Sequence, residues 1–430
     1  QSRIDGFHTV IATEKEQYIY SMGLCLQMTG GAAGAVFGGD DGKPLSYPFV
    51  GDVDEMALIQ PSADYWRVLM FNKEKPLMPA WGTQRAYGRH APGWCETFRK
   101  DGCLLAAVKE FWQESPKEFS VDPKGVLNMG FVGMRSAEHM DLRNGPYAAE
   151  EQSGGNSQGV AKTTRFSLEF HAPDTDTALS ERASANRSDL AVWIDPEWMQ
   201  EADPLWAPVT RCTPDSQDPR KRAYANYVAM YVQNPPRAPE VVNGLNRYGI
   251  LNWGDRVHGM ATRGWFNNED YYIPYSEWIG YLATGNRDLL DSVTQFSRHL
   301  MDIDTLNYTT GDQGLLGLQA RHRRIHWGHP AIVTHTFVDQ SLIYYYLFGY
   351  ERGLDHAELI RQGQKVWQWW PAPGWYSPSN TTGACARDYG VNFRLLMDVY
   401  LQTWEPALLV RAHELWTRFA KGFTADFQHP

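Results

Sequence analysis

The pattern of apolar positions changes near the middle of the chain. Up to about residue 215, short apolar runs alternate with clusters of Gly, Pro, Asp and Asn, and no helical period is sustained. Three such runs are Tyr65–Phe71, Gly102–Val108 and Thr164–Phe170. This spacing predicts a domain of short antiparallel strands over residues 1–218, arranged as a sandwich or a barrel.

From about residue 220 onward, apolar residues recur at helical spacing. Short turns after Leu282, Leu347 and Leu401 join the expected helices in pairs that repeat after roughly 60 residues. This repeat indicates an (α/α) toroid of helix hairpins over residues 219–430, with an ordinary helical bundle as the alternative. A closed toroid has about twice as many hairpins, so we expect the chain to be incomplete at its C-terminal end. The expected helices are Tyr272–Ala283, Asn286–Leu300, Ile332–Phe348, Leu354–Trp370, Asp388–Thr403 and Pro406–Phe419.

Composition excludes some partners. The 430 residues include 40 basic and 50 acidic side chains, a net charge of −10, and no lysine-rich patch. That balance argues against a nucleic-acid partner. No run of 18 apolar residues exists, so no membrane-spanning segment is expected. Aromatic residues make up 13% of the chain, with 17 tryptophans, which suits either a large aromatic core or the stacking of sugar rings.

Weaker signals favour a secreted glycoprotein. Gln1 is not an initiator residue, which is typical of a processed chain, and glycosylation sequons begin at Asn186, Asn307 and Asn380. The five cysteines have no metal-binding spacing, and their odd number leaves at least one thiol free. Cys95 and Cys103 flank a turn-like stretch and could pair across a hairpin.

The candidate chemistry is concentrated between Asn252 and Tyr346. Six of the 13 histidines lie in this window, beside seven arginines and many aromatic residues. Such a mixture is typical of a cleft that stacks sugar rings, pairs with carboxylates and moves protons.

An ordered set of motifs resembles one known family. The segment 102–117 (GCLLAAVKEFWQESPK) is followed by 191–198 (AVWIDPEW) and by Asn252–Asp255. Trp265 with Asn267–Glu269, then Arg298–Asp304, then His335–Gly349 complete the set. From about residue 100 the chain therefore resembles the exo-acting rhamnogalacturonan lyases of polysaccharide lyase family 26 and their relatives. The resemblance implies a β-rich, RIFT-barrel-type domain before an (α/α) toroid.

The resemblance also implies an activity. The enzyme would be a carbon–oxygen lyase that cleaves a uronate-containing polysaccharide by β-elimination. Rhamnogalacturonan is the first expectation for this acidic polysaccharide substrate, and ulvan or a rhamnose–glucuronate chain is the next.

A uronate lyase must neutralise the substrate carboxylate, remove the proton at C5 and protonate the oxygen that leaves C4. His322 and His326 are the leading candidates for proton transfer, and Tyr271, Tyr272 and His258 come next. Arg321 and Arg323, together with Asn268, are expected to bind the carboxylate. The remaining expected substrate-binding residues are Trp253, Trp265 and Trp327, which would stack sugar rings, and Glu269, Asp255, His335 and Arg387.

Two other functions fit the same residues. A glycoside hydrolase would use Glu269 and Asp255 as its carboxylate pair, and a non-catalytic carbohydrate-binding protein would need no catalytic group. No metal or other cofactor is expected, although calcium at Asp302 and Asp304 stays open. Arginine neighbours disfavour a zinc site at the histidines of the loop, and His299, a lone helical histidine, is expected to be structural. The histidines considered for zinc are His322, His326, His329 and His335.

Overall fold

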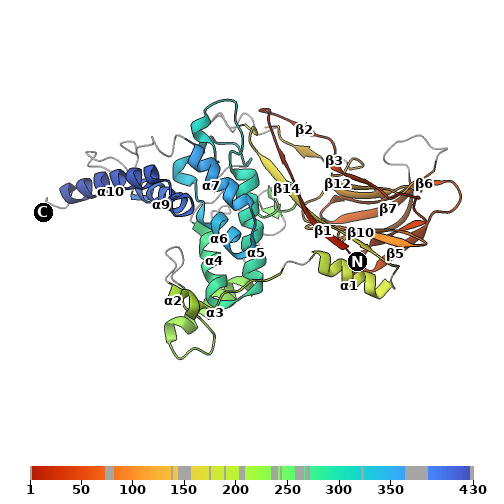
Figure 1. The fold of residues 1–430 in the computed structure, drawn as a ribbon, viewed down its shortest axis with the longest axis horizontal. Coiled ribbons are helices and arrows are strands. Elements are labelled where there is room, and N and C mark those ends of the chain that lie inside the picture. The colour runs from red at the N-terminus through yellow and green to blue at the C-terminus, as the bar shows by residue number, and fades with distance from the viewer. Residues whose placement is uncertain are drawn as a thin grey trace.

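A β-sandwich and a group of helices lie side by side in the computed structural model (Figure 1). The structure describes residues 2–72, 82–136, 139–143, 156–173, 176–187, 190–202, 209–233, 241–242, 245–256, 266, 272–320, 324–363 and 386–426.

The first sheet of the sandwich contains both ends of the β-rich sequence. Its order is β1 (Ser2–Ile11), β14 (Ala161–His171), β10 (Gly102–Val108), β9 (Trp94–Arg99), β4 (Gly34–Gly38) and β5 (Pro44–Pro48). Neighbouring strands are antiparallel. The expected strand at Gly102–Val108 is confirmed to the residue.

The second sheet packs against the first. Its order is β3 (Met22–Gln27), β12 (Val126–Val132), β11 (Lys117–Val121), β6 (Val53–Ser62), β7 (Tyr65–Asn72) and β8 (Thr83–Gly88), again antiparallel. Each sheet has two edge strands, so the described strands form a sandwich and not a closed barrel. Short pairs add β2 (Tyr18–Ile19) with β13 (Met140–Asp141), β15 (Val241–Val242) with β16 (Leu245–Asn246), and β17 (Gln319–Ala320) with β18 (Ala331–Ile332).

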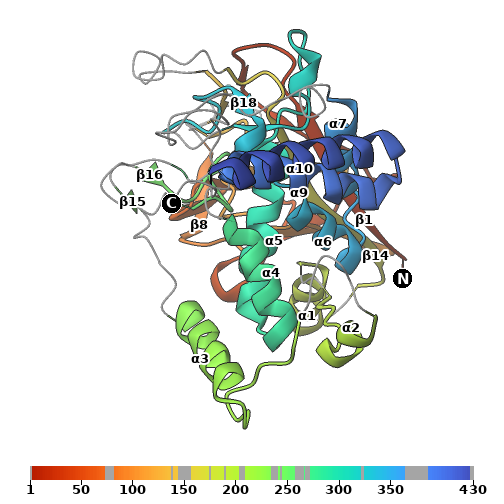
Figure 2. The ribbon, with the colours of Figure 1, turned by 90° about the vertical axis from the view of Figure 1, so that its left-hand side faces the viewer.

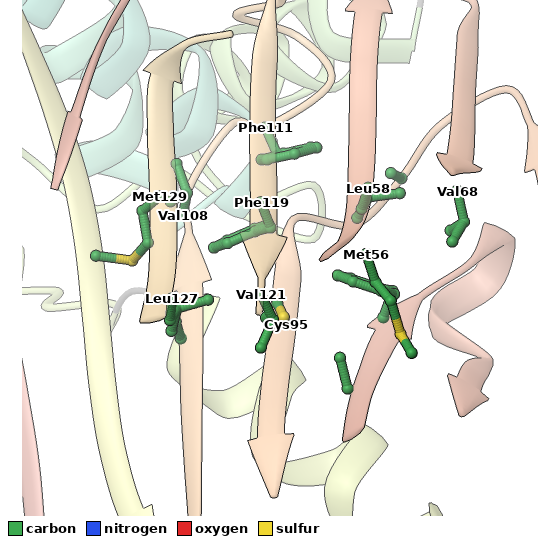
Figure 3. Close-up of a cluster of buried hydrophobic side chains, with 14 of the residues drawn as sticks. Met56, Leu58, Val68, Cys95, Val108, Phe111, Phe119, Val121, Leu127 and Met129 are labelled. Carbon is green, nitrogen blue, oxygen red and sulfur yellow. The ribbon is translucent and has the colours of Figure 1, made fainter. Parts of the chain in front are cut away.

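Side-chain alternation along the strands gives the first sheet two buried faces. One face joins the second sheet in the sandwich core, which includes Phe119 and Met129 (Figure 3). Trp94 and Leu105 on the opposite face pack against Leu179 of α1 (Asp176–Arg187). The sheet that carries β14 is therefore a rigid support.

The cysteine pairing expected across the β9–β10 hairpin is wrong. Cys95 lies opposite Ala106, whereas Cys103 lies opposite Phe98. Because Cys103 and Ala106 are three positions apart on one strand, their side chains point to opposite faces of the sheet. Cys95 and Cys103 are both buried.

The helices form three antiparallel hairpins, as the sequence pattern predicts. These are α4 (Ile273–Thr284) with α5 (Arg287–His299), α6 (Asp339–Phe348) with α7 (Arg352–Gln362), and α9 (Ala386–Thr403) with α10 (Pro406–Asp426) (Figures 1 and 2). The Asn286 side chain caps α5 by accepting bonds from the amides of Asp288 and Leu289. Two further helices, α2 (Pro196–Ala202) and α3 (Pro219–Gln233), precede them. The arrangement of the hairpins into a toroid stays a prediction.

One helix begins later than expected. Residues 332–338, which the sequence pattern placed in a helix, instead contain β18 and the 3-10 turn Val333–His335 before α6. The Thr336 hydroxyl holds this segment, since it accepts a bond from the Gln319 amide and donates to the Ile332 carbonyl, both at 2.8 Å. None of the described helices combines the length and the apolar character that crossing a bilayer requires.

Buried polar links join the sandwich to the helices. Asp302 accepts bonds from the Thr163 amide of β14 at 2.8 Å and from the Thr163 hydroxyl at 3.0 Å, and it pairs with Arg352 at 3.1 Å. Glu110 lies at 2.7 Å from Arg165 and at 3.0 Å from Arg298 of α5. These links set the position of the C-terminal end of α5 against β14. Residues 190–202 and 209–218 belong by packing to the helical part, because Ile194, Met199, Val209 and Cys212 join its core.

Candidate functional site

Two aspartates and two histidines converge beside the junction of the two parts. The side chains of Asp255, His299, Asp304 and His326 are 0%, 1%, 0% and 3% exposed. One ligand atom from each residue lies within 4.8 Å of the others, so the group could hold a metal ion. We call these four residues the Asp/His cluster.

A π-helical turn supplies His299 and Asp304. Helix α5 ends at His299, and Leu300–Asp304 continues it as a π-helix, in which residues five apart become neighbours. His299 Nε2 lies 3.5 Å from Asp304 Oδ1. An α-helix would separate two residues five positions apart by about 140° around its axis, so the π-helical turn is what brings them together.

The sandwich positions Asp255 through the loop 246–256. The amides of Gly249 and Ile250 donate to the carbonyls of Gln113 and Ser115 at 2.8 and 2.9 Å. Asp255 then places Oδ2 3.4 Å from His299 Nε2.

Gly254 permits this approach. Its φ is +101°, and a Cβ there would lie 2.5 Å from the Gln295 carbonyl oxygen and 3.0 Å from the His299 Cβ. Any larger residue would therefore push the loop away from α5.

His326 reaches the cluster from the loop before β18. Its Nδ1 lies 3.1 Å from Asp255 Oδ2 and 3.6 Å from Asp304 Oδ1. Phe266 stacks on the ring with centroids 4.1 Å apart. On the other side of the ring, Nε2 lies 3.0 Å from Asn252 Oδ1.

Interactions within the cluster shift the pKa values of His299 and Asp255 in opposite directions. Burial alone lowers the pKa of His299, but the carboxylates of Asp304 and Asp255 raise it to about 10. Burial alone raises the pKa of Asp255, but the interactions with His299 and His326 hold it well below its usual range. In the absence of a metal ion, the folded chain therefore keeps a protonated His299 beside an ionised Asp255.

Aromatic rings form a row that leads to the cluster. His90 stacks on Trp112 with centroids 4.0 Å apart, and Trp112 lies 5.1 Å from Tyr248. Tyr248 stacks on Trp253 with ring centroids 5.3 Å apart. The Trp253 carbonyl oxygen lies 3.3 Å from His299 Nδ1. All four rings of this aromatic row are half-buried, so each is partly open to solvent.

A cavity of about 140 Å³ adjoins the cluster. Asp304 and Trp327 line it together with His329 and Val160, the residue before β14. Trp327 is buried among apolar side chains of both parts of the molecule, which include Val160 and Ile303. Trp327 therefore packs between the two parts, and its expected stacking role stays a prediction. The cavity brings solvent-sized space next to Asp304.

Of the remaining expected site residues, the structure describes Tyr272, His335 and Arg387, which are not members of the Asp/His cluster. The Tyr272 hydroxyl donates to Asp339, and burial together with that carboxylate raises the pKa of Tyr272. Arg394 pairs with Asp339 at 2.6 Å and lies over the Tyr272 ring. His335 is buried in its 3-10 turn, and Arg387 lies in the first turn of α9. The expected residues outside the described part are His258, Trp265, Asn268, Glu269, Tyr271, His322, Arg321 and Arg323.

Asp302 and Asp304, the pair at which calcium was left open, have different partners in the structure. Asp302 binds Arg352 and Thr163, whereas Asp304 faces His299 and His326. His299, which was expected to be structural, is a central member of the cluster. The spacing of Arg298-His299 to Asp304 is the signal in the sequence that marks it.

No family model matches the sequence, and no curated protein matches it.

Proposed function

We propose that this chain is a polysaccharide lyase that cleaves a uronate-containing polysaccharide by β-elimination, with a rhamnogalacturonan-type polymer as the first substrate to test. The observation that carries the proposal is the half-buried aromatic row that runs from His90 to Trp253 and ends beside the Asp/His cluster. Sugar rings stack on such aromatic faces. The ordered sequence motifs support the same class.

The proposed reaction needs a base for the C5 proton. The electron pair of the C5–H bond forms the C4–C5 double bond, the C4–O bond breaks, and the leaving oxygen takes up a proton. Both ring nitrogens of His326 already face Asn252 or the aspartates of the cluster, and its side chain is 3% exposed. We therefore assign proton abstraction to His322, and we assign to His326 the role of holding that loop.

The other candidate bases rank lower. A tyrosine base must lose its proton, and the raised pKa of Tyr272 opposes this. Tyr271 and His258 remain the next candidates. Binding of the substrate carboxylate is assigned to Arg321 or Arg323 with Asn268, since guanidinium and amide donors suit a carboxylate.

The test is to incubate the protein with rhamnogalacturonan, ulvan and a rhamnose–glucuronate polymer while following the ultraviolet absorbance of an unsaturated uronate. We expect the chromophore to appear with at least one polymer and to be lost in His322→Ala. His413→Ala is the matched control, because His413 is an exposed histidine on α10. New reducing ends without the chromophore would replace the lyase with a hydrolase, and saturable binding without any cleavage would leave only a binding protein.

A further inference from the structure

We propose that the Asp/His cluster is a structural site for a tetrahedral divalent metal ion of the Zn²⁺ class, which locks the loop 246–256 and the segment around His326 onto the end of α5. The ligands are the facing atoms Asp255 Oδ2, His299 Nε2, Asp304 Oδ1 and His326 Nδ1.

The distances between these atoms favour coordination over direct hydrogen bonds. The four nitrogen–oxygen distances are 3.4, 3.5, 3.1 and 3.6 Å. Charge-assisted hydrogen bonds are shorter, at about 2.7–2.9 Å. A tetrahedron with metal–ligand bonds of about 2.0–2.1 Å has edges of about 3.3–3.4 Å, and the four nitrogen–oxygen distances lie close to that length. All the ligand atoms lie within 4.8 Å of one another.

Both histidines are held in the tautomer that ligation needs. Asn252 Nδ2 donates to the Asn246 carbonyl at 2.7 Å, which orients Oδ1 of the same amide toward His326 Nε2. His326 Nε2 must then carry the hydrogen, and Nδ1 presents its lone pair to the cluster. His299 Nδ1 faces the Trp253 carbonyl at 3.3 Å, which likewise leaves Nε2 as the ligand. A metal-ligating histidine characteristically donates its other ring N–H to such an oxygen.

Charge balance supports the same assignment. Two fully buried carboxylates need two positive charges nearby, because an uncompensated buried charge is costly. With neutral histidine ligands, one divalent cation supplies both charges. Two imidazoles with two carboxylates suit Zn²⁺, whereas Ca²⁺ takes six to eight oxygen ligands.

Protein side chains supply all four ligands of a tetrahedral ion, which is typical of a structural ion, whereas a catalytic ion keeps one position for water or substrate. Each of the four ligand side chains is at most 3% exposed, and together they fill a tetrahedral set. The ligands come from three segments that are far apart in the sequence: loop 246–256, the end of α5 with its π-helical turn, and the loop that carries His326. An ion there ties these segments together without taking part in the β-elimination proposed above.

The first test uses the unaltered chain. Metal analysis after purification and exhaustive dialysis should find about one zinc per chain, and chelation should lower the melting temperature until zinc is restored. Replacement by Co²⁺ should give the intense visible absorbance of a tetrahedral ion. A chain that binds no zinc after reconstitution overturns the proposal, and so does a weak octahedral Co²⁺ spectrum or a site that takes only calcium.

Variants separate loss of the metal from loss of the fold. Asp304→Asn should weaken zinc binding by at least about a hundredfold, and Asn252→Ala, which removes only the hydrogen-bond partner of His326, by about ten- to a hundredfold. His356→Gln is the control, because His356 is also a buried histidine but lies outside the cluster. Equal zinc affinity in Asp304→Asn and the control would refute the site. Where a variant fails to fold, the measurements on the unaltered chain decide.

Discussion

Asp302 and Asp304 stand two residues apart on one π-helical turn and serve different networks. Asp304 belongs to the Asp/His cluster, whereas Asp302 joins β14 to α7 through Thr163 and Arg352. A single turn thus positions the cluster and fastens the helices to the sandwich. The acidic pair, at which the sequence left calcium open as an alternative, therefore contributes one residue to each of these two networks.

Asp302→Asn should destabilise the junction. The substitution leaves the Arg352 guanidinium without its buried counter-ion, and such a loss costs about 3–5 kcal/mol. Asp355→Asn is the matched control, since Asp355 also pairs with Arg352 but its side chain is 60% exposed. We expect the control to change the free energy of unfolding by less than about 1 kcal/mol. Denaturant unfolding measures the free energy of unfolding of both variants. Equal losses in the two variants would contradict a stabilising role of Asp302 at the junction.

Gly254→Ala should cost more than Gly349→Ala. Both glycines have positive φ, but a Cβ at Gly349 meets nothing within 4 Å, whereas one at Gly254 would lie 2.5 Å from a backbone oxygen of α5. Gly349 lies at φ +66°, in the left-handed region that other residues can adopt, whereas Gly254 lies at φ +101°, outside it. Gly254→Ala therefore adds both a steric cost and a larger backbone cost. We expect Gly254→Ala to lose about 1–3 kcal/mol more in the free energy of unfolding. Similar losses would show that the loop carrying Asp255 can move away without cost.

Much of the fold follows from local sequence patterns. The strand Gly102–Val108 and the helix pairs were predictable because turn residues and apolar periodicity report on neighbouring residues. The start of α6 was not predictable, because the Thr336 hydroxyl bonds that hold residues 332–336 out of the helix involve Gln319, 17 positions earlier.

The candidate site was predictable only in part. Local density of polar and aromatic residues indicated Asp255 and His326. His299 was not among the predicted site residues, because a lone histidine in a helix was expected to be structural. Its proximity to Asp304 depends on a π-helical turn, and no periodic sequence pattern predicts such a turn. The convergence of three distant segments is a tertiary property, so the spacing within any one segment cannot show it.

His356 should make the fold sensitive to acid. Burial lowers the pKa of His356 to about 4, and its ring nitrogens lie 3.0 Å from Ser341 Oγ and from the Gly317 carbonyl. The folded chain therefore keeps this histidine neutral. Its contribution is fully present above the unfolded pKa of about 6.5 and is lost as the pH falls toward 4, by on the order of 3 kcal/mol.

The check is the difference between variants in their pH dependence. In His356→Gln, the fall in the free energy of unfolding between pH 7 and pH 4 should be smaller than in the unaltered chain. His413→Gln, at an exposed position on α10, should leave that fall unchanged. If His356→Gln has the same pH profile as the unaltered chain, the buried neutral histidine is not the acid-sensitive group.

Asn307 should stay free of glycan although it begins a sequon. Its side-chain nitrogen lies 2.9–3.2 Å from the carbonyl oxygens of Gly159, Met301, Asp302 and Thr305. Its side-chain oxygen accepts a bond from Arg352 at 3.0 Å. A glycan on this nitrogen would break these buried bonds. Peptide mass spectrometry of protein secreted from a glycosylating host should find Asn307 unmodified, and a glycan there in folded protein would contradict the buried arrangement.

The aromatic row should contribute to substrate binding. Trp112 lies in its middle, between His90 and Tyr248, so Trp112→Ala removes contacts on both sides. One lost stacking contact of about 0.5–1.5 kcal/mol should raise KM for the cleaved polymer by about 3- to 10-fold. If the stacked sugar lies away from the bond that breaks, kcat should change less than KM. Trp404→Ala is the matched control, because Trp404 is 67% exposed at the turn between α9 and α10 and lies outside the row. Initial rates over a range of polymer concentrations measure both constants, and an unchanged KM in Trp112→Ala would limit the row to packing between the sandwich and the loop 246–256.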